Sequence, residues 1–188
     1  MLGNNFIIIP SIRSMKDFEH ALSAESKYVF LSEIHIGNLK VMVEKCHSSN
    51  KLVVVNIELI GGFSADQVGL KLLKSFYNVD AVLSSNAMKI NIAKSLGFKT
   101  VQRFFLMDSR SFDSTLKSLQ TTKNDAVEIL PGPIAPQFID AIKKVRNVPM
   151  IAGGFVSTKD MVKELYKAGF SGVTSSTRDL WKLKLTTK

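Results

Sequence analysis

The sequence has few of the residues that build metal centres, disulfides or membrane spans. It contains one cysteine, Cys46, and three histidines, His20, His35 and His47, which show no metal-ligand spacing. A lone cysteine cannot form an internal disulfide, so nothing indicates an oxidising compartment. No apolar run approaches the roughly 18 to 20 residues that cross a bilayer. We therefore expect a cytoplasmic protein without a metal, a cofactor or a membrane partner.

Several catalytic and nucleotide-binding signatures are also missing. The chain has no Gly-x-Ser-x-Gly elbow, Walker loop or Rossmann fingerprint. Its N-terminal stretch lacks the basic start and apolar core of a secretion signal. Its 188 residues are 45% hydrophobic and 22% charged, which is typical of a folded globule. We expect a single domain over residues 1–188.

Acidic residues are scarce relative to basic ones. The chain has 25 Lys and Arg against 16 Asp and Glu, for a net charge of +9. Residues 139–188 hold ten of the basic residues and only four of the acidic ones. Such an excess attracts a polyanion such as RNA, although solvated helix faces are its ordinary explanation. Charge alone does not decide between the two.

Short apolar, β-branched runs recur along the whole chain, and each is followed by a stretch with helical periodicity. Near-continuous apolar runs of this length favour parallel strands covered by helices. Eight such units predict a small α/β protein, a (β/α)8 TIM-like barrel, with an open doubly wound sheet as the alternative. The predicted strands cover residues 6–10, 28–32, 52–59, 80–85, 100–106, 125–132, 149–154 and 171–176.

The helical stretches carry recognisable start and stop signals. The clearest helix is expected from Ser157, as N-cap, to Ala168, with Gly169 ending it. The segments "AKSLGFKTV" and "YKAGFSGV" each read as a helix end, a Gly-Phe turn and a new strand, which suggests a repeated unit. We expect Trp181 to pack the last helix onto the barrel.

Two loops near the C-terminus predict a phosphate site. In this fold the loops after the seventh and eighth strands often bind phosphate. Gly153 and Gly154 end the seventh predicted strand and can present backbone N–H groups to an anion. Opposite them, Thr174, Ser175 and Ser176 offer hydroxyls, next to a helix expected to begin near residue 177. A tight turn plus an ordinary serine cap is the competing interpretation.

Charged residues follow other predicted strands and would gather at the same end of the barrel. Arg13 follows the first strand, Glu58 the third, and Glu128 lies on the sixth. Gln102 and Arg103 are neighbours, so a regular strand can aim only one of them inward. The two glutamates either contact a ligand or are neutralised by an arginine within the barrel, since an unpaired buried charge is costly.

Seven segments in one order carry a family resemblance. They are "PSIRSM", "IHIGNL", "ELIGG", "QRFFLMDS", "VEILPG", "AGGF" and "VTSS....LW". With them, nearly the whole chain resembles the glycerol-3-phosphate-responsive antiterminators of bacterial glycerol-uptake operons. The resemblance implies a TIM-like barrel that binds sn-glycerol 3-phosphate. It also implies that the liganded protein acts on leader mRNA, so that transcription passes a terminator ahead of glycerol genes.

The resemblance also implies roles for individual residues. Gly153, Gly154, Ser175 and Ser176 would hold the phosphate, with Arg13 pairing it or a carboxylate. Candidates for the glycerol hydroxyls are Glu58, Gln102 and Glu128. This chain departs from the expected pattern twice, with Glu58 where an aspartate is expected and Asn86 where a basic residue is expected.

The residues leave three functional classes open. A ligand-gated RNA-binding regulator is the first, and Lys159, Lys163 and Lys167 would then face the RNA from one side of a helix. A barrel enzyme (isomerase, lyase or transferase) acting on a small phosphorylated substrate is the second, with Glu58 and Glu128 as acid and base. A scaffold with a vestigial pocket is the third. The oligomeric state, a homodimer included, is left open.

Overall fold

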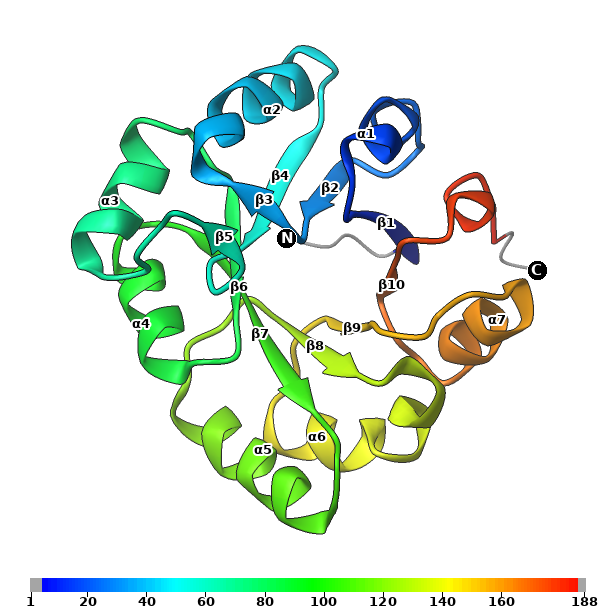
Figure 1. The fold of residues 1–188 in the computed structure, drawn as a ribbon. Helices are drawn as coiled ribbons and strands as arrows, with labels where there is room; N and C mark the ends of the chain where they lie inside the picture. Colours follow the sequence, from blue (N-terminus) through cyan, green and yellow to red (C-terminus); the bar gives the residue numbers. More distant parts are fainter. Residues whose placement is uncertain (1–4, 186–188) are drawn as a thin grey trace.

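The structure is one closed barrel of eight parallel strands inside a ring of helices (Figure 1). The computed structural model describes residues 5–185, and the rest of the predicted domain 1–188 lies outside this description. The strands follow one another around the barrel in the order β1-β10-β9-β8-β7-β6-β4-β2. They are β1 (Ile7–Ile12), β2 (Tyr28–Leu31), β4 (Leu52–Asn56), β6 (Ala81–Ser84), β7 (Lys99–Phe105), β8 (Ala126–Leu130), β9 (Met150–Ala152) and β10 (Gly172–Ser175). Every predicted strand is present, and the predicted barrel is confirmed.

Helices connect the strands and form the outer layer. They are α1 (Met15–Leu22), α2 (Ile36–Ser48), α3 (Gln67–Ser75), α4 (Ala87–Ser95), α5 (Ser109–Thr121), α6 (Ile139–Val145), α7 (Lys159–Lys167), and the 3-10 helices η1 (Gly132–Gln137) and η2 (Arg178–Leu180). The eighth helical position, between α7 and α1, is taken by η2 alone, a turn of three residues (Figure 1). Among the described residues, no helix combines the length and the apolar character that crossing a membrane requires.

The barrel interior is filled by side chains. One apolar cluster lies inside the barrel and a larger one lies between the strands and the helices. The inner cluster consists of Ile9, Phe30, Val54, Ala81, Leu83, Val101, Ala126 and Ile151. It leaves a cavity of about 10 Å³, roughly the volume that a single water needs. The barrel interior therefore has no room for a ligand larger than a water molecule.

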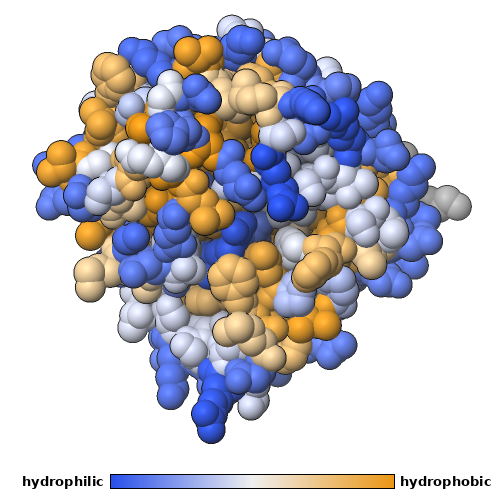
Figure 2. All heavy atoms as spheres, in the orientation of Figure 1, coloured by the Kyte–Doolittle hydropathy of each residue, from blue (hydrophilic) through white to orange (hydrophobic). Residues whose placement is uncertain are grey.

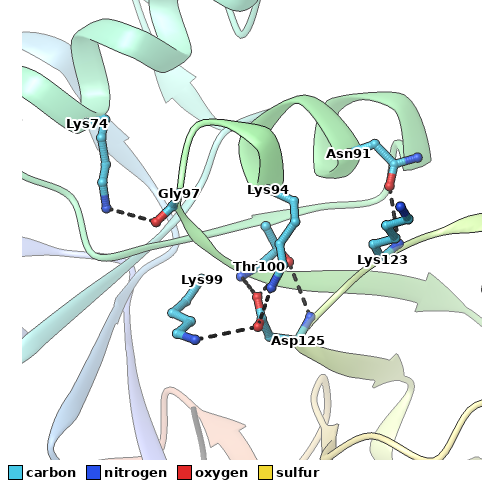
Figure 3. A network of polar contacts seen from close by, with 8 residues as sticks. All are labelled: Lys74, Asn91, Lys94, Gly97, Lys99, Thr100, Lys123 and Asp125. Atoms are coloured by element: carbon cyan, nitrogen blue, oxygen red, sulfur yellow. Dashed lines mark hydrogen bonds and ion pairs between the residues drawn. The ribbon is translucent and has the colours of Figure 1, made fainter.

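Aspartates tie neighbouring strands together at the end where the strands begin. Asp125 Oδ2 accepts a hydrogen bond from the N–H of Thr100 at 2.9 Å, and its Oδ1 accepts one from Lys94 at 2.5 Å (Figure 3). Asp80, in the equivalent place before β6, accepts a hydrogen bond from the N–H of Val53 at 2.8 Å. The same acid at the same point of two units confirms that the chain repeats a structural module.

Two helices end in matching turns, as the paired sequence segments predict. Gly97 after α4 and Gly169 after α7 have φ angles of 80° and 88°, which glycine adopts without strain. The phenylalanine that follows each glycine is buried. A lysine from the preceding helix donates to each glycine carbonyl, Lys74 to Gly97 at 3.2 Å (Figure 3) and Lys143 to Gly169 at 3.0 Å. These bonds satisfy carbonyls that a helix end leaves free.

The start of α7 differs from its prediction. The helix covers Lys159–Lys167, and its N-cap is Thr158, one residue after the predicted serine. The Thr158 hydroxyl accepts a hydrogen bond from the N–H of Met161 at 3.2 Å, a role that serine and threonine fill about equally well. Val162 and Leu165 are the buried residues of the helix.

Candidate ligand site at the mouth of the barrel

The loops after β9 and β10 are joined by hydrogen bonds. The Ser175 hydroxyl donates to the carbonyl of Val156 at 2.6 Å and accepts from the N–H of Thr177 at 3.1 Å. The indole of Trp181 donates to the Ser175 carbonyl at 2.8 Å, and its side chain is buried as predicted. The two loops therefore face each other, in the arrangement that the sequence predicts for an anion site.

An ion pair lies beneath these loops. The guanidinium of Arg103 donates through Nε to Oε2 of Glu128 at 2.6 Å, and Thr174 donates to Oε1 of the same carboxylate at 2.6 Å. Glu128 is fully buried, and its charge is compensated by these two groups. The guanidinium also lies 5.4 Å from the centre of the Phe30 ring. The expectation that an arginine neutralises an acid within the barrel is thus met by Arg103.

The two glycines of the β9 loop differ in what their amides do. The N–H of Gly153 donates to the carbonyl of Ile129 at 3.0 Å, so it continues the sheet and is not free. The N–H groups of Gly154 and Phe155 have no hydrogen-bond partner among residues 5–185. Both residues have positive φ, 70° and 60°, which turns the chain sharply away from the strand. The expected pair of free glycine amides is corrected to Gly154 and Phe155.

The three predicted hydroxyls also have unequal roles. Those of Thr174 and Ser175 are already donated, to Glu128 and to the β9 loop. Ser176 is exposed, and its hydroxyl has no partner within the described part of the chain. The helix expected near residue 177 is only the three-residue η2, so its dipole adds little to the site. Ser176 is the hydroxyl left to meet a ligand.

Glu58 follows β4 at the mouth of the barrel. Its side chain is hydrogen-bonded to Ser84 of β6 and to Ser85 in the loop after β6. Its carboxylate accepts hydrogen bonds from the hydroxyl of Ser84 at 2.7 Å, and from the N–H and hydroxyl of Ser85 at 3.1 and 3.0 Å. Burial alone would raise the pKa of Glu58, but these bonds and the charge of Lys89 outweigh it and lower the pKa below its ordinary value. Glu58 is therefore a carboxylate at neutral pH. Lys89 is not predicted as a site residue from the strand pattern, because it lies on helix α4.

Two other predicted ligand residues point elsewhere. Gln102 is buried toward α5, where its side-chain amide donates to the hydroxyl of Ser118 at 2.9 Å. Its neighbour Arg103 takes the inward position, because side chains alternate along β7. Arg13 is exposed and pairs with Glu33 at 3.3 Å. The structure thus brings neither Gln102 nor Arg13 to the two loops.

The second predicted departure, Asn86, has a structural role. Its side-chain oxygen accepts hydrogen bonds from the N–H groups of Met88 and Lys89 at 2.9 and 3.2 Å and so caps α4. A basic residue at this position would not cap the helix, because its side chain has no acceptor.

Two further glycines at the mouth are explained by a histidine. The short strands β3 (Ile34–His35) and β5 (Ile60–Gly61) pair above the barrel. The ring of His35 lies so close to Gly61 and Gly62 that a Cβ on either would stand 3.1 Å from it. A side chain at either position would therefore crowd this ring, and Gly62 also has a positive φ of 72°, which favours glycine.

Exposed hydrophobic side chains surround the polar centre of the mouth. Met88, Met107 and Phe155 are 72%, 82% and 81% exposed, and each follows the end of a barrel strand. In the space-filling view, hydrophilic residues gather near the centre of this face, with hydrophobic patches around them (Figure 2). No cluster of three potential metal ligands occurs among the described residues.

Comparison with known proteins identifies the family. A family model described as glycerol-3-phosphate responsive antiterminator matches residues 8–181. The chain belongs to this family. The similar antiterminator structures include the glycerol uptake operon antiterminator regulatory protein of Listeria monocytogenes, which is 29% identical with a TM-score of 0.89 over 95% of this chain and 96% of that one.

Two further relatives match most of this chain. The glycerol uptake operon antiterminator-related protein of Thermotoga maritima is 27% identical, with a TM-score of 0.85 over 97% of this chain and 100% of that one. The uncharacterized protein YgcP of Escherichia coli is 25% identical over 176 residues, which are 94% of this chain and 92% of that protein. The family inferred from the sequence segments is confirmed.

Proposed function

We propose that this antiterminator binds sn-glycerol 3-phosphate at the mouth of the barrel and, when liganded, binds leader mRNA of glycerol genes and prevents termination. The observation that carries the ligand assignment is the pair of free amides at Gly154 and Phe155, on a loop that the Ser175–Val156 hydrogen bond joins to the loop that carries Ser176. Free N–H groups in a turn are a common anion site.

The phosphate would take its hydrogen bonds from both loops and from Arg103. The Gly154 and Phe155 amides and the Ser176 hydroxyl supply three donors. The Arg103 side chain is only 12% exposed, and the Nε–H that it gives to Glu128 is one of five donors in its guanidinium. Its remaining N–H groups add positive charge at the edge of a dry interior, where charge-assisted bonds are strong. Glu128 supports the ligand by orienting Arg103.

The glycerol hydroxyls would meet Glu58. Its carboxylate is exposed and ionised, and a carboxylate accepts up to about four hydrogen bonds. Three of these are taken by Ser84 and Ser85, which leaves capacity for a ligand hydroxyl. Two fixed sites, one for the phosphate and one for the hydroxyls, favour glycerol 3-phosphate over either glycerol or free phosphate.

The bonds around both glutamates favour binding over catalysis. A general acid or base needs a proton affinity near the working pH and free access to the substrate. The pKa of Glu58 is lowered, and both oxygens of buried Glu128 are bonded to Arg103 and Thr174. The lowered pKa makes Glu58 a weak base at neutral pH, and the bonds of Glu128 leave its carboxylate inaccessible to a substrate.

Isothermal titration with glycerol 3-phosphate, glycerol and inorganic phosphate tests the ligand assignment. We expect Ser176→Ala to weaken binding several-fold and Ser176→Asp to abolish it, because a carboxylate would stand beside the phosphate. Ser114→Asp on α5 is the matched control, since Ser114 is exposed and has no partner within the described residues. Unchanged affinity in Ser176→Asp would refute this placement of the phosphate.

Amide hydrogen exchange provides a second measurement on the same loop. The amides of Gly154 and Phe155 should exchange fast in the free protein and slow down when glycerol 3-phosphate binds. The amide of Gly153 is an internal reference, because it is already bonded to Ile129. Ligand-independent exchange at both positions would contradict the proposed cradle.

The regulatory part is tested with leader RNA transcribed from upstream of the glycerol-uptake genes of the same genome. We expect the wild-type protein to bind this RNA more tightly with glycerol 3-phosphate than without it, and to increase read-through in a transcription assay. Equal binding with and without the ligand would rule out ligand gating.

A further inference from the structure

The shortened eighth helix leaves a groove on the side of the barrel. The hollow beside η2 has a volume of about 540 Å³. In Figure 1 the short η2 turn lies between α1 and α7. The residues that line it are His20, Ser23, Ala24, Lys159, Arg178, Asp179, Trp181 and Lys182. This η2 groove therefore combines one acidic residue with three basic ones and a histidine.

Two of the groove's cations are unpaired. Lys159 and Lys182 have no hydrogen-bond or ion-pair partner among the described residues, and both are exposed. Arg178 is partly used, since its Nε donates to Asp17 at 2.5 Å and its Nη2 to the Lys16 carbonyl at 3.1 Å. Those two bonds fix the guanidinium at the edge of the groove and leave its other N–H groups available.

We propose that the η2 groove is the surface on which this protein holds the phosphate backbone of its RNA. The proposal rests on the proposed function. Lysine and arginine side chains at the edges of a hollow are the groups that contact nucleic-acid phosphates, and they give binding that depends strongly on salt. Recognition by shape and phosphates fits a chain that has no RNA-binding sequence motif.

The same groove connects RNA binding to the ligand. Lys159 begins the helix that follows the Gly154–Phe155 loop, and Arg178 begins the turn that follows Ser176. The Ser175–Val156 bond joins the two segments. A phosphate that bridges both loops would hold Lys159 and Arg178 at a fixed separation. Ligand binding then pre-organises the RNA surface, which is a physical route for the gating.

The groove revises the sequence-based choice of RNA contacts. Of the three lysines predicted on α7, only Lys159 lines the groove. Lys163 pairs with Asp160 at 3.0 Å, which reduces its charge available to RNA. Lys167 is the last residue of α7 and lies at the end of the helix away from the Gly154–Phe155 loop. The second free lysine of the groove is Lys182, which lies outside α7.

The experiment compares two double variants of equal charge. Lys159→Gln/Lys182→Gln removes the free groove cations, and Lys71→Gln/Lys117→Gln removes two exposed, unpaired lysines from α3 and α5. Binding of the fluorescein-labelled leader RNA is measured by anisotropy at several salt concentrations with saturating glycerol 3-phosphate. We expect the groove variant to bind at least about tenfold more weakly and its salt slope to fall by about 1.4 to 1.8, whereas the control changes less than about threefold.

Glycerol 3-phosphate affinity is measured in parallel on every variant. Loss of RNA binding in the groove variant alone, with ligand affinity unchanged, supports the proposal. Equal losses in both variants, or none in the groove variant, would place the RNA elsewhere and overturn the groove while leaving the antiterminator function intact. A wild-type protein that does not bind the RNA would overturn the proposed function itself.

Discussion

At position 153 the backbone runs so close to the buried ion pair that a methyl group has no room. A Cβ there would lie 2.5 Å from Oγ1 of Thr174 and 2.7 Å from Oε1 of Glu128. This glycine is therefore required for packing, and its neighbour Gly154 is favoured by its φ of 70°. One dipeptide thus meets two separate physical demands.

Gly153→Ala should destabilise the protein by about 1 to 3 kcal/mol, the usual cost of overpacking a tight site. It should also weaken glycerol 3-phosphate binding, because the Glu128 and Thr174 side chains would have to shift. Urea unfolding and titration calorimetry measure the two effects. Gly37→Ala is the control, since its Cβ would make ordinary contact at 3.4 Å and improve helix propensity. Equal stability of the two variants would disprove the packing argument.

At the scale of elements, the two ends of the barrel strands carry different roles. The starts hold Asp80 and Asp125, which bond to the backbone of the neighbouring strand. The ends hold the loops of the site. In this fold, residues at the start of the strands usually stabilise the barrel, and residues at the end of the strands usually form the functional site.

Asp125→Asn tests the structural end. Burial alone would raise the pKa of Asp125, but bonds from Lys94 and Thr100 outweigh it and lower the pKa. A lowered folded-state pKa contributes stability above the ordinary value of about 3.9, and that stability is lost as pH falls through the folded-state pKa. We expect the variant to lose about 1 to 3 kcal/mol at pH 5 to 8 and progressively less below about pH 4.

The measurement is urea unfolding at each pH, compared with Asp113→Asn. Asp113 is exposed on α5 and has no partner within the described residues. A deficit in Asp125→Asn that stayed constant down to pH 2 would mean that the ion pair is not its cause.

At the scale of the whole molecule, the barrel is a rigid frame with one incomplete side. The interior of the barrel is filled by side chains, so we expect the proposed ligand to act on the loops and not on the core. Among the described residues, seven α-helices cover the strands, and the groove beside η2 lies next to the loops of the proposed site.

Because ligand binding is linked to folding, glycerol 3-phosphate should stabilise the whole chain. At 100 times its Kd a ligand adds about 2.7 kcal/mol, which corresponds to a rise in Tm of about 5 to 10 °C for a domain of this size. Differential scanning fluorimetry measures the shift. Glycerol should give no shift, and Ser176→Asp should lose it. An equal shift with glycerol would show that the phosphate is not what the loops recognise.

Local chemistry made much of this structure predictable. Apolar runs and glycine stops locate the eight strands and the turns at Gly97 and Gly169, because these signals depend on nearby residues alone. The family segments identify the two ligand loops for the same reason. The N-cap of α7 differs from its prediction by one residue, since Ser157 and Thr158 are chemically alike and either hydroxyl can cap a helix.

The sequence by itself determined the barrel and the family, and it predicted the end at which we propose that a ligand binds, because periodicity and loop composition are properties of short segments. The tertiary structure decided which side chains reach that ligand. Alternation along β7 allows either Gln102 or Arg103 inside, and buried Glu128 selects Arg103, because a buried carboxylate requires a charged partner. In the same way, the tertiary structure shows that the Gly153 amide is not available to a ligand, because it donates to the Ile129 carbonyl. It also shows the groove beside η2, which no sequence pattern indicated.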